Sequence, residues 1–215
     1  MPDAAVDVLR RAIFDGSLPP GSQLLEVQLA QQLGISRAPL REALHRLEAE
    51  GFVVRVPYRG AFVAGVEPQI ADEIAQIRLV LEPYVVQQGL AALRSGPVHD
   101  ELLAAADALI EAAQRGDAGD SIEAHLAVHR IMYEASGNSR VAEIWKGWET
   151  HMRLFLAVDH KSFAQLEDMA RRHLDLVRVV ETGDQATILR ELAVHIHGSV
   201  VTPEGLVPPP PLEPA

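Results

Sequence analysis

Apolar residues in the first part of the chain recur with a helical period. Val6, Leu9 and Ile13 follow one another at three- and four-residue spacing and stop before Gly16, which predicts an amphipathic helix ended by a turn. A second apolar run over residues 27–33 predicts another helix. The chain therefore begins with helices that each keep an apolar face for packing.

A turn and a third helix follow. Gly34 suits the left-handed conformation that ends many helices, and Ser36 is a candidate N-cap for a helix over residues 37–50. Two helices joined by so short a turn are typical of a helix-turn-helix, whose second helix presents its N-terminal residues to the major groove of DNA.

The exposed face of this third helix carries basic residues. Arg37 and Arg41 are one turn apart, where they can reach base edges and phosphates, and Arg46 lies farther along, near phosphate reach. The alternative is that Arg37 and Arg41 are solvated residues paired with Glu42 or Glu48. An isolated motif of this kind does not separate the two interpretations.

A hairpin completes the pattern. Residues 52–56 and 61–64 have β-like composition beside glycine turns, and the tip between them could lay a basic side chain into the minor groove. The order of helix, helix, turn, basic helix and hairpin is much more restrictive than any single piece. It predicts a winged helix-turn-helix.

The rest of the chain has a helical pattern throughout. An apolar stripe predicts a long helix over residues 69–93, in which Pro83 should produce a kink or lie at a bend. The members of the stripe are Ile70, Ile74, Ile77 and Leu81. Further helices are predicted over residues 98–115, 119–136, 139–158, 163–182 and 184–200. We therefore expect a mainly α fold, an N-terminal winged helix-turn-helix followed by an antiparallel all-helical bundle.

The distribution of charged residues divides the chain at residue 66, between the predicted winged helix-turn-helix and the helical part. Of its 19 Lys and Arg and 30 Asp and Glu, seven of each fall in residues 1–66, so the whole net charge of -11 belongs to the remainder. A uniformly basic coat for nucleic acid is excluded, and contact with DNA must be local. These features predict a DNA-binding domain over residues 1–66, a helical domain over 67–201 and an extended Pro-rich tail over 202–215.

The amino-acid composition excludes several other classes of protein. The absence of Cys excludes disulfide scaffolds and thiolate catalysis, and it fits a reducing compartment. No apolar run approaches the roughly 18 residues of a membrane span, and no secretory leader is evident. We therefore expect a cytoplasmic protein with no membrane partner.

Histidines supply the metal-binding chemistry. His125 and His129 are four residues apart, so on a helix both imidazoles project from one face and can bind one metal ion. His173 and His195 lie on two later helices among apolar neighbours, which indicates a core-facing setting. Four neutral imidazoles suit zinc, nickel, copper or iron. The alternative for each is an ordinary surface histidine or a hydrogen-bonded core histidine.

Residues 5–64 resemble the winged-helix domain of GntR-family transcription regulators. The resemblance rests on the strings GSLPPGSQL (16–24), LAQQLGISRAPLREAL (29–44), RLEAEG (46–51) and RGAFV (59–63). It implies that residues of the recognition helix and the wing contact DNA. These candidates are Ser36, Arg37, Pro39, Arg41, Arg46, Arg59 and Gly60.

The helical part resembles the FCD ligand-binding domain of the FadR-like branch of that family. The strings are IRLVLEP (77–83) and HRIMYEASGN (129–138), with further matches at His173 and His195. Metal-containing members use three His with an Asp one turn before the first, so the resemblance carries over His129, His173 and His195 as ligands. His125 occupies the Asp position, and its role as a fourth ligand is inferred from spacing.

The resemblance also implies a small ligand beside the metal ion. Arg78 occupies the position of a family arginine that faces the cavity, where a guanidinium could hold a carboxylate bidentately. The alternative is a salt bridge to Glu73 or Glu82. His151 is a second candidate for effector contact, because its helix also carries Arg153 and could line a cavity.

An enzyme is the less favoured interpretation. A zinc-hydrolase helix needs a Glu directly after the first His of the pair, and residues 125–129 read HLAVH. A dimerisation bundle without metal is a further alternative. We expect a homodimeric transcription regulator, a repressor like most such proteins, that binds a palindromic operator in double-stranded DNA. Its helical domain is expected to bind a divalent metal ion, zinc or nickel, and a small carboxylate metabolite that modulates operator binding.

Overall fold

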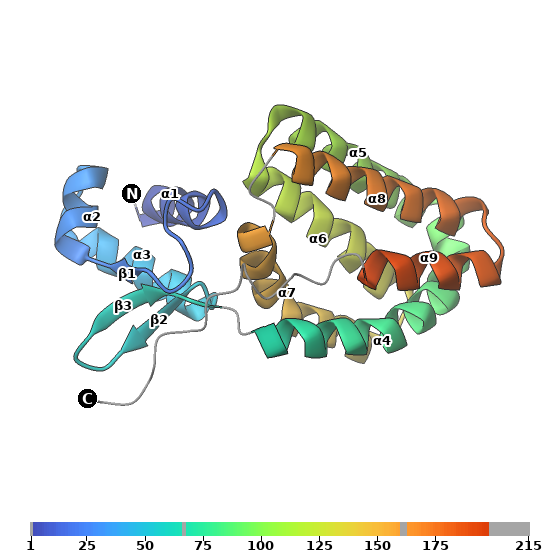
Figure 1. Cartoon of the computed structure of the whole chain (residues 1–215), viewed down its shortest axis with the longest axis horizontal. Coiled ribbons are helices and arrows are strands. Elements are labelled where there is room, and N and C mark those ends of the chain that lie inside the picture. Colours follow the sequence, from blue (N-terminus) through green and yellow to red (C-terminus); the bar gives the residue numbers. More distant parts are fainter. Residues whose placement is uncertain (1, 66–67, 160–162, 198–215) are drawn as a thin grey trace.

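The computed structural model describes residues 2–65, 68–159 and 163–197, which form two units (Figure 1). The first contains α1 (Pro2–Phe14), α2 (Glu26–Leu33), α3 (Arg37–Ala49), β1 (Gln23–Leu24), β2 (Val53–Val56) and β3 (Gly60–Val63). The second contains α4 (Pro68–Arg94), α5 (Pro97–Arg115), α6 (Ala118–Ala135), α7 (Ser139–Asp159), α8 (Phe163–Thr182) and α9 (Gln185–His197). The predicted mainly helical fold, a winged helix-turn-helix before a helical bundle, is confirmed. The predicted tail over residues 202–215 lies outside the described residues.

None of the described helices is long and apolar enough to cross a bilayer.

The helices of the first unit pack through the faces that their periodicity predicts. Leu40, Leu44 and Leu47 lie on the inner face of α3 and are fully buried. The opposite face of α3 is therefore left to solvent, with its arginines. Gly34 ends α2 in the left-handed conformation, with a φ of 63°. Ser36 stands at the N-cap position of α3, where its side chain makes no capping hydrogen bond.

The wing is a three-stranded antiparallel sheet rather than a two-stranded hairpin. Strand β3 lies between β1 and β2, so that Phe62 is opposite both Gln23 and Val54. The sequence pattern gives no sign of β1, because two residues are too few to show a strand's alternation of apolar and polar positions. Its pairing is set by backbone hydrogen bonds, among them the Val63 N–H to the Ser22 carbonyl at 2.9 Å.

The inner face of α4 differs from the predicted apolar stripe. Ile74 is buried, but Ile77 is 45% exposed. Arg78 and Glu82 take the inward positions instead, and both are buried. The helix continues through Pro83 without a break. A polar pair enclosed by the bundle therefore replaces part of the expected apolar stripe.

Helices α4 and α6 approach each other closely at Gly89. A Cβ atom at this position would lie 2.9 Å from three atoms of Ala135, including its backbone carbonyl carbon and oxygen. We expect Gly89→Ala to lower the free energy of unfolding by about 1–2 kcal/mol, because the overpacking outweighs the gain in helix propensity. Urea denaturation measures this change.

Gly147→Ala in α7 is the matched control for Gly89→Ala. No neighbouring heavy atom lies within 4 Å of the Cβ position at Gly147. This substitution should therefore raise the free energy of unfolding by roughly 0.5–1 kcal/mol, since alanine is the better helix former. Changes of the same sign in the two variants would contradict a close approach at Gly89.

Helix α7 lies at the boundary between the two units (Figure 1). The hydroxyl of Thr150 on α7 donates a hydrogen bond to the backbone carbonyl of Glu50 at 2.9 Å. Glu50 is the C-cap residue of α3. The helical unit therefore touches the first unit directly at the end of its third helix.

Candidate functional site

Two basic side chains project from the start of α3. Arg37 and Arg41 are each more than half exposed, and both approach Glu26 on α2. Arg41 Nε donates to a Glu26 carboxylate oxygen at 2.7 Å, and Arg37 Nη2 lies 3.4 Å from the same oxygen. The hydrogen bond from Arg41 is the main cause of a lowered pKa for Glu26. Glu26, rather than Glu42 or Glu48, is therefore the acid beside the two arginines.

This arrangement leaves the arginines available for DNA. A solvent-exposed ion pair contributes only about 0–1 kcal/mol, because water screens it and ordering the side chains costs entropy. A DNA phosphate can therefore displace the Glu26 carboxylate from Arg37 and Arg41 at little cost. The recognition helix α3 thus presents two guanidinium groups that a weak internal contact holds in place.

The other predicted DNA contacts on α3 have different surroundings. Ser36 is exposed beside Arg37, and Pro39 is half-buried in the first turn of the helix. Arg46 is turned toward α1, where it pairs with Asp3 and lowers the pKa of that carboxyl. The structure therefore brings Ser36, Arg37 and Pro39 to one helix end, while Arg46 lies beyond them with a partner on another helix.

The tip of the wing presents Tyr58 beside Arg59, and both are exposed. Tyr58 is fully exposed, and its φ of 63° lies in the left-handed region, which costs a bulky residue on the order of 1 kcal/mol. The Arg59 guanidinium lies 5.5 Å from the centre of the Phe62 ring, and the Arg59 carbonyl accepts a hydrogen bond from Gln23 Nε2 at 2.7 Å. Gly60 follows with a φ of 96°. No local sequence pattern marks Tyr58, because only the closed turn imposes its conformation.

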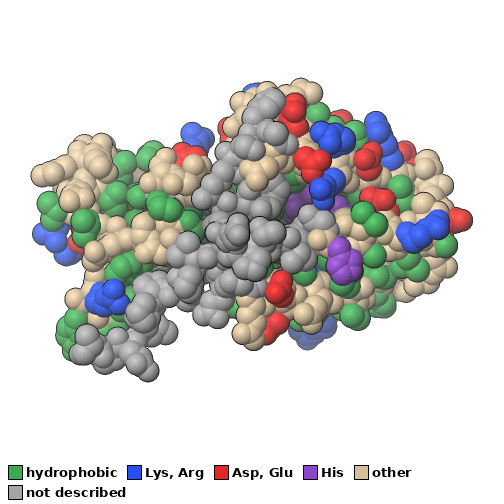
Figure 2. Space-filling model, in the orientation of Figure 1, with side chains coloured by type: hydrophobic (Ala, Val, Ile, Leu, Met, Phe, Trp, Pro, Cys, Tyr) green, Lys and Arg blue, Asp and Glu red, His purple; other side chains and the backbone are tan. Residues whose placement is uncertain are grey.

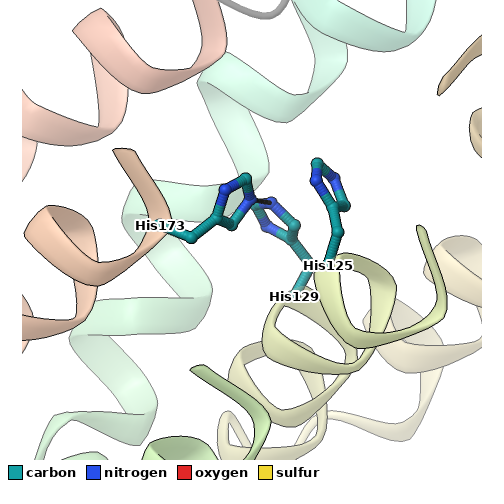
Figure 3. Close-up of side chains that lie close together, drawn as sticks. All are labelled: His125, His129 and His173. Carbon is teal, nitrogen blue, oxygen red and sulfur yellow. Dashed lines mark hydrogen bonds between the residues drawn. The ribbon is translucent and has the colours of Figure 1, made fainter. Parts of the chain in front are cut away.

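Four histidines meet inside the helical bundle and are called the histidine cluster below. His125 and His129 come from α6, His173 from α8 and His195 from α9, and each is at most 2% exposed. The ring centroids of neighbouring members lie 4.2–5.3 Å apart. Figure 3 shows the rings of His129 and His173 meeting through their nitrogens, with His125 beside them. The structure therefore gathers all four histidines that the sequence singled out.

The ring nitrogens are spaced as the ligands of one metal ion would be. The Nε2 atom of His129 lies 3.2 Å from that of His173 and 3.3 Å from that of His195. Metal–nitrogen bonds of about 2.0–2.1 Å in a tetrahedral site place ligand nitrogens about 3.3 Å apart. One nitrogen each of His125, His129 and His173 also lies within 4.8 Å of the others. The histidine cluster therefore fits a divalent ion that accepts nitrogen ligands.

A contact behind the ring orients His173. Its Nδ1 lies 2.8 Å from the carbonyl of Met169, so we assign the proton to Nδ1 and the lone pair to Nε2. Nδ1 of His129 lies 3.5 Å from a carboxylate oxygen of Glu82 and makes no hydrogen bond among the described residues. At 3.2 Å, the His173 lone pair either accepts a hydrogen bond from His129 Nε2 or shares a cation with it. The geometry is therefore compatible with a cation bound between the two rings.

Burial disfavours a proton as that cation. It lowers the pKa of His129 and His195 well below the ordinary value, and the Arg78 guanidinium, 3.3 Å from His129 Nε2, lowers the pKa of His129 further. Arg78 Nε also donates to Glu82 at 2.7 Å, and burial raises the pKa of the Glu82 carboxyl against the attraction of Arg78. His129 and His195 are therefore neutral, which is the form that binds a metal ion.

The buried ion pair of Arg78 and Glu82 leads to a stability prediction. We expect Arg78→Met alone to lower the free energy of unfolding by about 3–5 kcal/mol, because it leaves the Glu82 charge buried without its partner. The double substitution Arg78→Met with Glu82→Leu removes both charges and should recover most of that loss. Chemical denaturation of metal-free protein measures both variants. A single variant as stable as the wild type would contradict an ionised pair.

Two further side chains differ from the sequence-based picture. Tyr133 is buried against Trp145, with ring centroids 4.9 Å apart, and its hydroxyl has no hydrogen-bond partner among the described residues. Burial and the nearby Glu82 charge raise the pKa of Tyr133. His151 is exposed on α7, and the structure does not bring it to the histidine cluster. No pattern in the sequence distinguished Tyr133 from an ordinary core residue.

Comparison with known proteins covers both units. A family model described as bacterial regulatory proteins of the gntR family matches residues 3–63, and a model of the FCD domain matches residues 73–198. A probable D-xylose utilization operon transcriptional repressor of Paenarthrobacter nicotinovorans is 28% identical over 190 residues, which cover 88% of this chain and 83% of that protein. An uncharacterized HTH-type transcriptional regulator of Mycobacterium tuberculosis is 30% identical over 211 residues, which cover 88% of this chain and 84% of that protein.

A solved structure has the same fold. The crystal structure of a putative transcriptional regulator GntR from Rhodococcus sp. RHA1 superposes with a TM-score of 0.70 and is 22% identical. The match covers 92% of this chain and 94% of that one. At this identity the likeness establishes the shared architecture of the two units and nothing about ligands.

Proposed function

Because this chain belongs to the GntR family of bacterial regulatory proteins, with the FCD domain of its FadR-like subgroup, we propose that it is a metal-dependent, carboxylate-responsive repressor. It is a DNA-binding transcription regulator and not an enzyme. In this proposal residues 1–66 bind the operator, residues 67–201 bind the metal ion and the effector, and residues 202–215 are a tail. The observation that carries the metal assignment is the approach of His129 Nε2 to the Nε2 atoms of His173 and His195, at 3.2 and 3.3 Å.

Operator binding rests on the exposed end of the recognition helix. Arg37 and Arg41 contact base edges and phosphates, with Ser36 and Pro39 in the same first turn. Arg46 and the wing residues Arg59 and Gly60 are secondary candidates. A homodimer presents two such helices to the two halves of a palindromic operator. A relative whose name describes a repressor supports the sign of the regulation.

The histidine cluster would hold the metal ion. In this proposal His129 is the central ligand, with His173 and His195 each close to its Nε2, and His125 is the fourth nitrogen donor. A divalent ion bound there supplies positive charge to an anionic ligand. Nitrogen-only ligands favour zinc or nickel over hard ions such as magnesium.

Arg78 is the proposed second anchor for the effector. Its Nη2 lies 3.3 Å from His129, so an anion beside the histidine cluster also lies beside this guanidinium. A planar carboxylate suits a guanidinium because it can accept two parallel hydrogen bonds. The Tyr133 hydroxyl, buried without a partner among the described residues, is available for a polar group of the same ligand. A small carboxylate is therefore the chemical class of effector that we propose.

Two measurements test the proposal together. Duplexes selected by the protein from a random-sequence library should contain an inverted repeat, as a dimer with two recognition helices requires. Elemental analysis of untagged protein should find about one zinc or nickel ion per chain. Selected duplexes without symmetry would contradict the dimeric operator complex. A chain that stays metal-free after zinc and nickel are added would refute the metal site and leave the dimerisation bundle as the better alternative.

A further inference from the structure

One residue of the helical unit is bound directly to the end of the recognition helix. The Thr150 hydroxyl donates to the Glu50 carbonyl at 2.9 Å, and the Thr150 methyl group packs against Gly51. A Cβ atom at Gly51 would lie 2.9 Å from that methyl carbon, and Gly51 has a φ of 82°. The contact therefore depends on glycine at position 51, which leaves room for the methyl group, and on the Thr150 hydroxyl.

The Glu50 carbonyl is a fitting attachment point. The last carbonyls of a helix have no partner within the helix and carry its partial negative charge, so a hydroxyl donor is favoured there. The Glu50 carboxylate is held as well, since Arg10 of α1 donates to it at 2.8 Å. Glu50, at the C-terminal end of α3, therefore has a side-chain contact to α1 and a backbone contact to α7.

The same helix, α7, also packs on the histidine cluster. Trp145 is fully buried, and its ring centroid lies 5.4 Å from that of His129, with the two planes 32° apart. Trp145 Nε1 donates to Glu149 at 2.8 Å, and Arg130 of α6 donates to the same oxygen at 2.6 Å. Thr150 follows Trp145 by five positions, a rise of about 7.5 Å along one helix. A displacement of Trp145 therefore moves Thr150 as well.

The two units also meet through α1, which packs against α6 and α7, and their buried apolar residues form one continuous core. A cleft of about 460 Å³ opens between them, and it is lined by residues of both units, including Arg10, Phe52, Lys146 and Arg153. Thr150 and Glu50 both line this cleft, so the hydrogen bond between them spans the boundary where open space adjoins both units. The Thr150 contact is therefore well placed to decide where the recognition helix lies.

We propose that Thr150 is a positioning residue for DNA binding, which transmits the state of the histidine cluster to the recognition helix through Trp145 and α7. This inference rests on the proposed function. Occupation of the histidine cluster shifts the His129 ring, the Trp145 ring follows it, and Thr150 moves the end of α3. In a dimer, a small change at each α3 alters the separation of the two helices that must fit one operator.

The test compares DNA affinity with and without zinc in two matched variants of the full chain. Thr150→Val keeps the shape of the side chain and removes the hydroxyl, whereas Thr150→Ser keeps the hydroxyl. The DNA is a duplex selected by the wild-type protein. We expect the affinities of zinc-loaded and zinc-free wild type to differ by about fivefold or more, the range typical of allosteric coupling. Thr150→Ser should retain this ratio, and Thr150→Val should bring it within about twofold of unity.

A second measurement distinguishes a positioning role of Thr150 from a general weakening of DNA binding. Coupling between two ligands is reciprocal, so DNA should change the zinc affinity of the wild type by the same factor and leave that of Thr150→Val unchanged. Trp145→Phe, which keeps a ring beside His129 and loses the donor to Glu149, should reduce the ratio as well. A merely structural role would lower both DNA affinities equally and preserve the ratio.

The outcomes that overturn the inference are distinct from failure of the proposed function. A wild-type ratio retained by Thr150→Val would overturn it. So would equal DNA affinities of zinc-loaded and zinc-free wild type, although zinc binding and operator binding would then both stand. A chain that binds no zinc or selects no operator removes the proposed function itself, and with it this inference.

Discussion

Replacing Arg37 and Arg41 together with alanine is expected to abolish operator binding at physiological salt. Each arginine that contacts a base or phosphate contributes about 1–3 kcal/mol, and a dimer presents both residues twice. The affinity should therefore fall by at least about 10³-fold. Titration of a selected duplex, followed by fluorescence anisotropy, measures the loss.

The fold should survive this double substitution. Both side chains are more than half exposed, and their contacts to Glu26 are of the weak, solvent-screened kind. The free energy of unfolding should change by less than about 1 kcal/mol, and bound metal should be unaffected. Zinc content and circular dichroism check both points.

A matched control removes the same charge elsewhere. Arg171 and Arg178 on α8 are exposed to a similar extent, and each pairs with an aspartate three residues earlier on the same helix. The double substitution Arg171→Ala with Arg178→Ala should retain operator binding. Strong binding by the Arg37/Arg41 double variant would refute the assignment of α3 as the recognition helix.

His129→Ala is expected to remove the metal ion. His129 is the residue whose Nε2 approaches both His173 and His195, so its loss leaves the other imidazoles without their common neighbour. Metal content should fall from about one ion per chain to near zero after dialysis. Zinc at about a thousand times its dissociation constant stabilises a protein by about 4 kcal/mol, and the variant should lose this stabilisation.

The control for His129→Ala is a histidine on a different face. His197 is exposed and lies two residues from His195 on α9, so it points away from the histidine cluster. His197→Ala should keep the wild-type metal content and the stabilisation by zinc. Unchanged metal stoichiometry in His129→Ala would refute the site, whereas metal loss in both variants would indicate a surface site instead.

The helices of the bundle could be predicted from the sequence, because the residues that start, continue and end a helix lie close together along the chain. The helix predicted over residues 98–115 is α5, which ends where Gly116 adopts a φ of 68°. Spacing also put His125 and His129 on one face of α6, since residues four apart on a helix are neighbours. Strand β1 was not open to prediction, because its two residues are strands only through their partner β3.

Amino-acid sequence alone therefore determined the order of the helices, the exposed arginines of α3 and the pairing of His125 with His129. These depend on helical periodicity and on turn residues, which act over a few positions. Only the tertiary structure decided that His129 meets His173 and His195, that Arg78 turns inward to Glu82, and that α7 holds the end of α3. Such contacts join residues far apart along the chain, and they depend on which helix faces pack together, a choice that no local pattern contains.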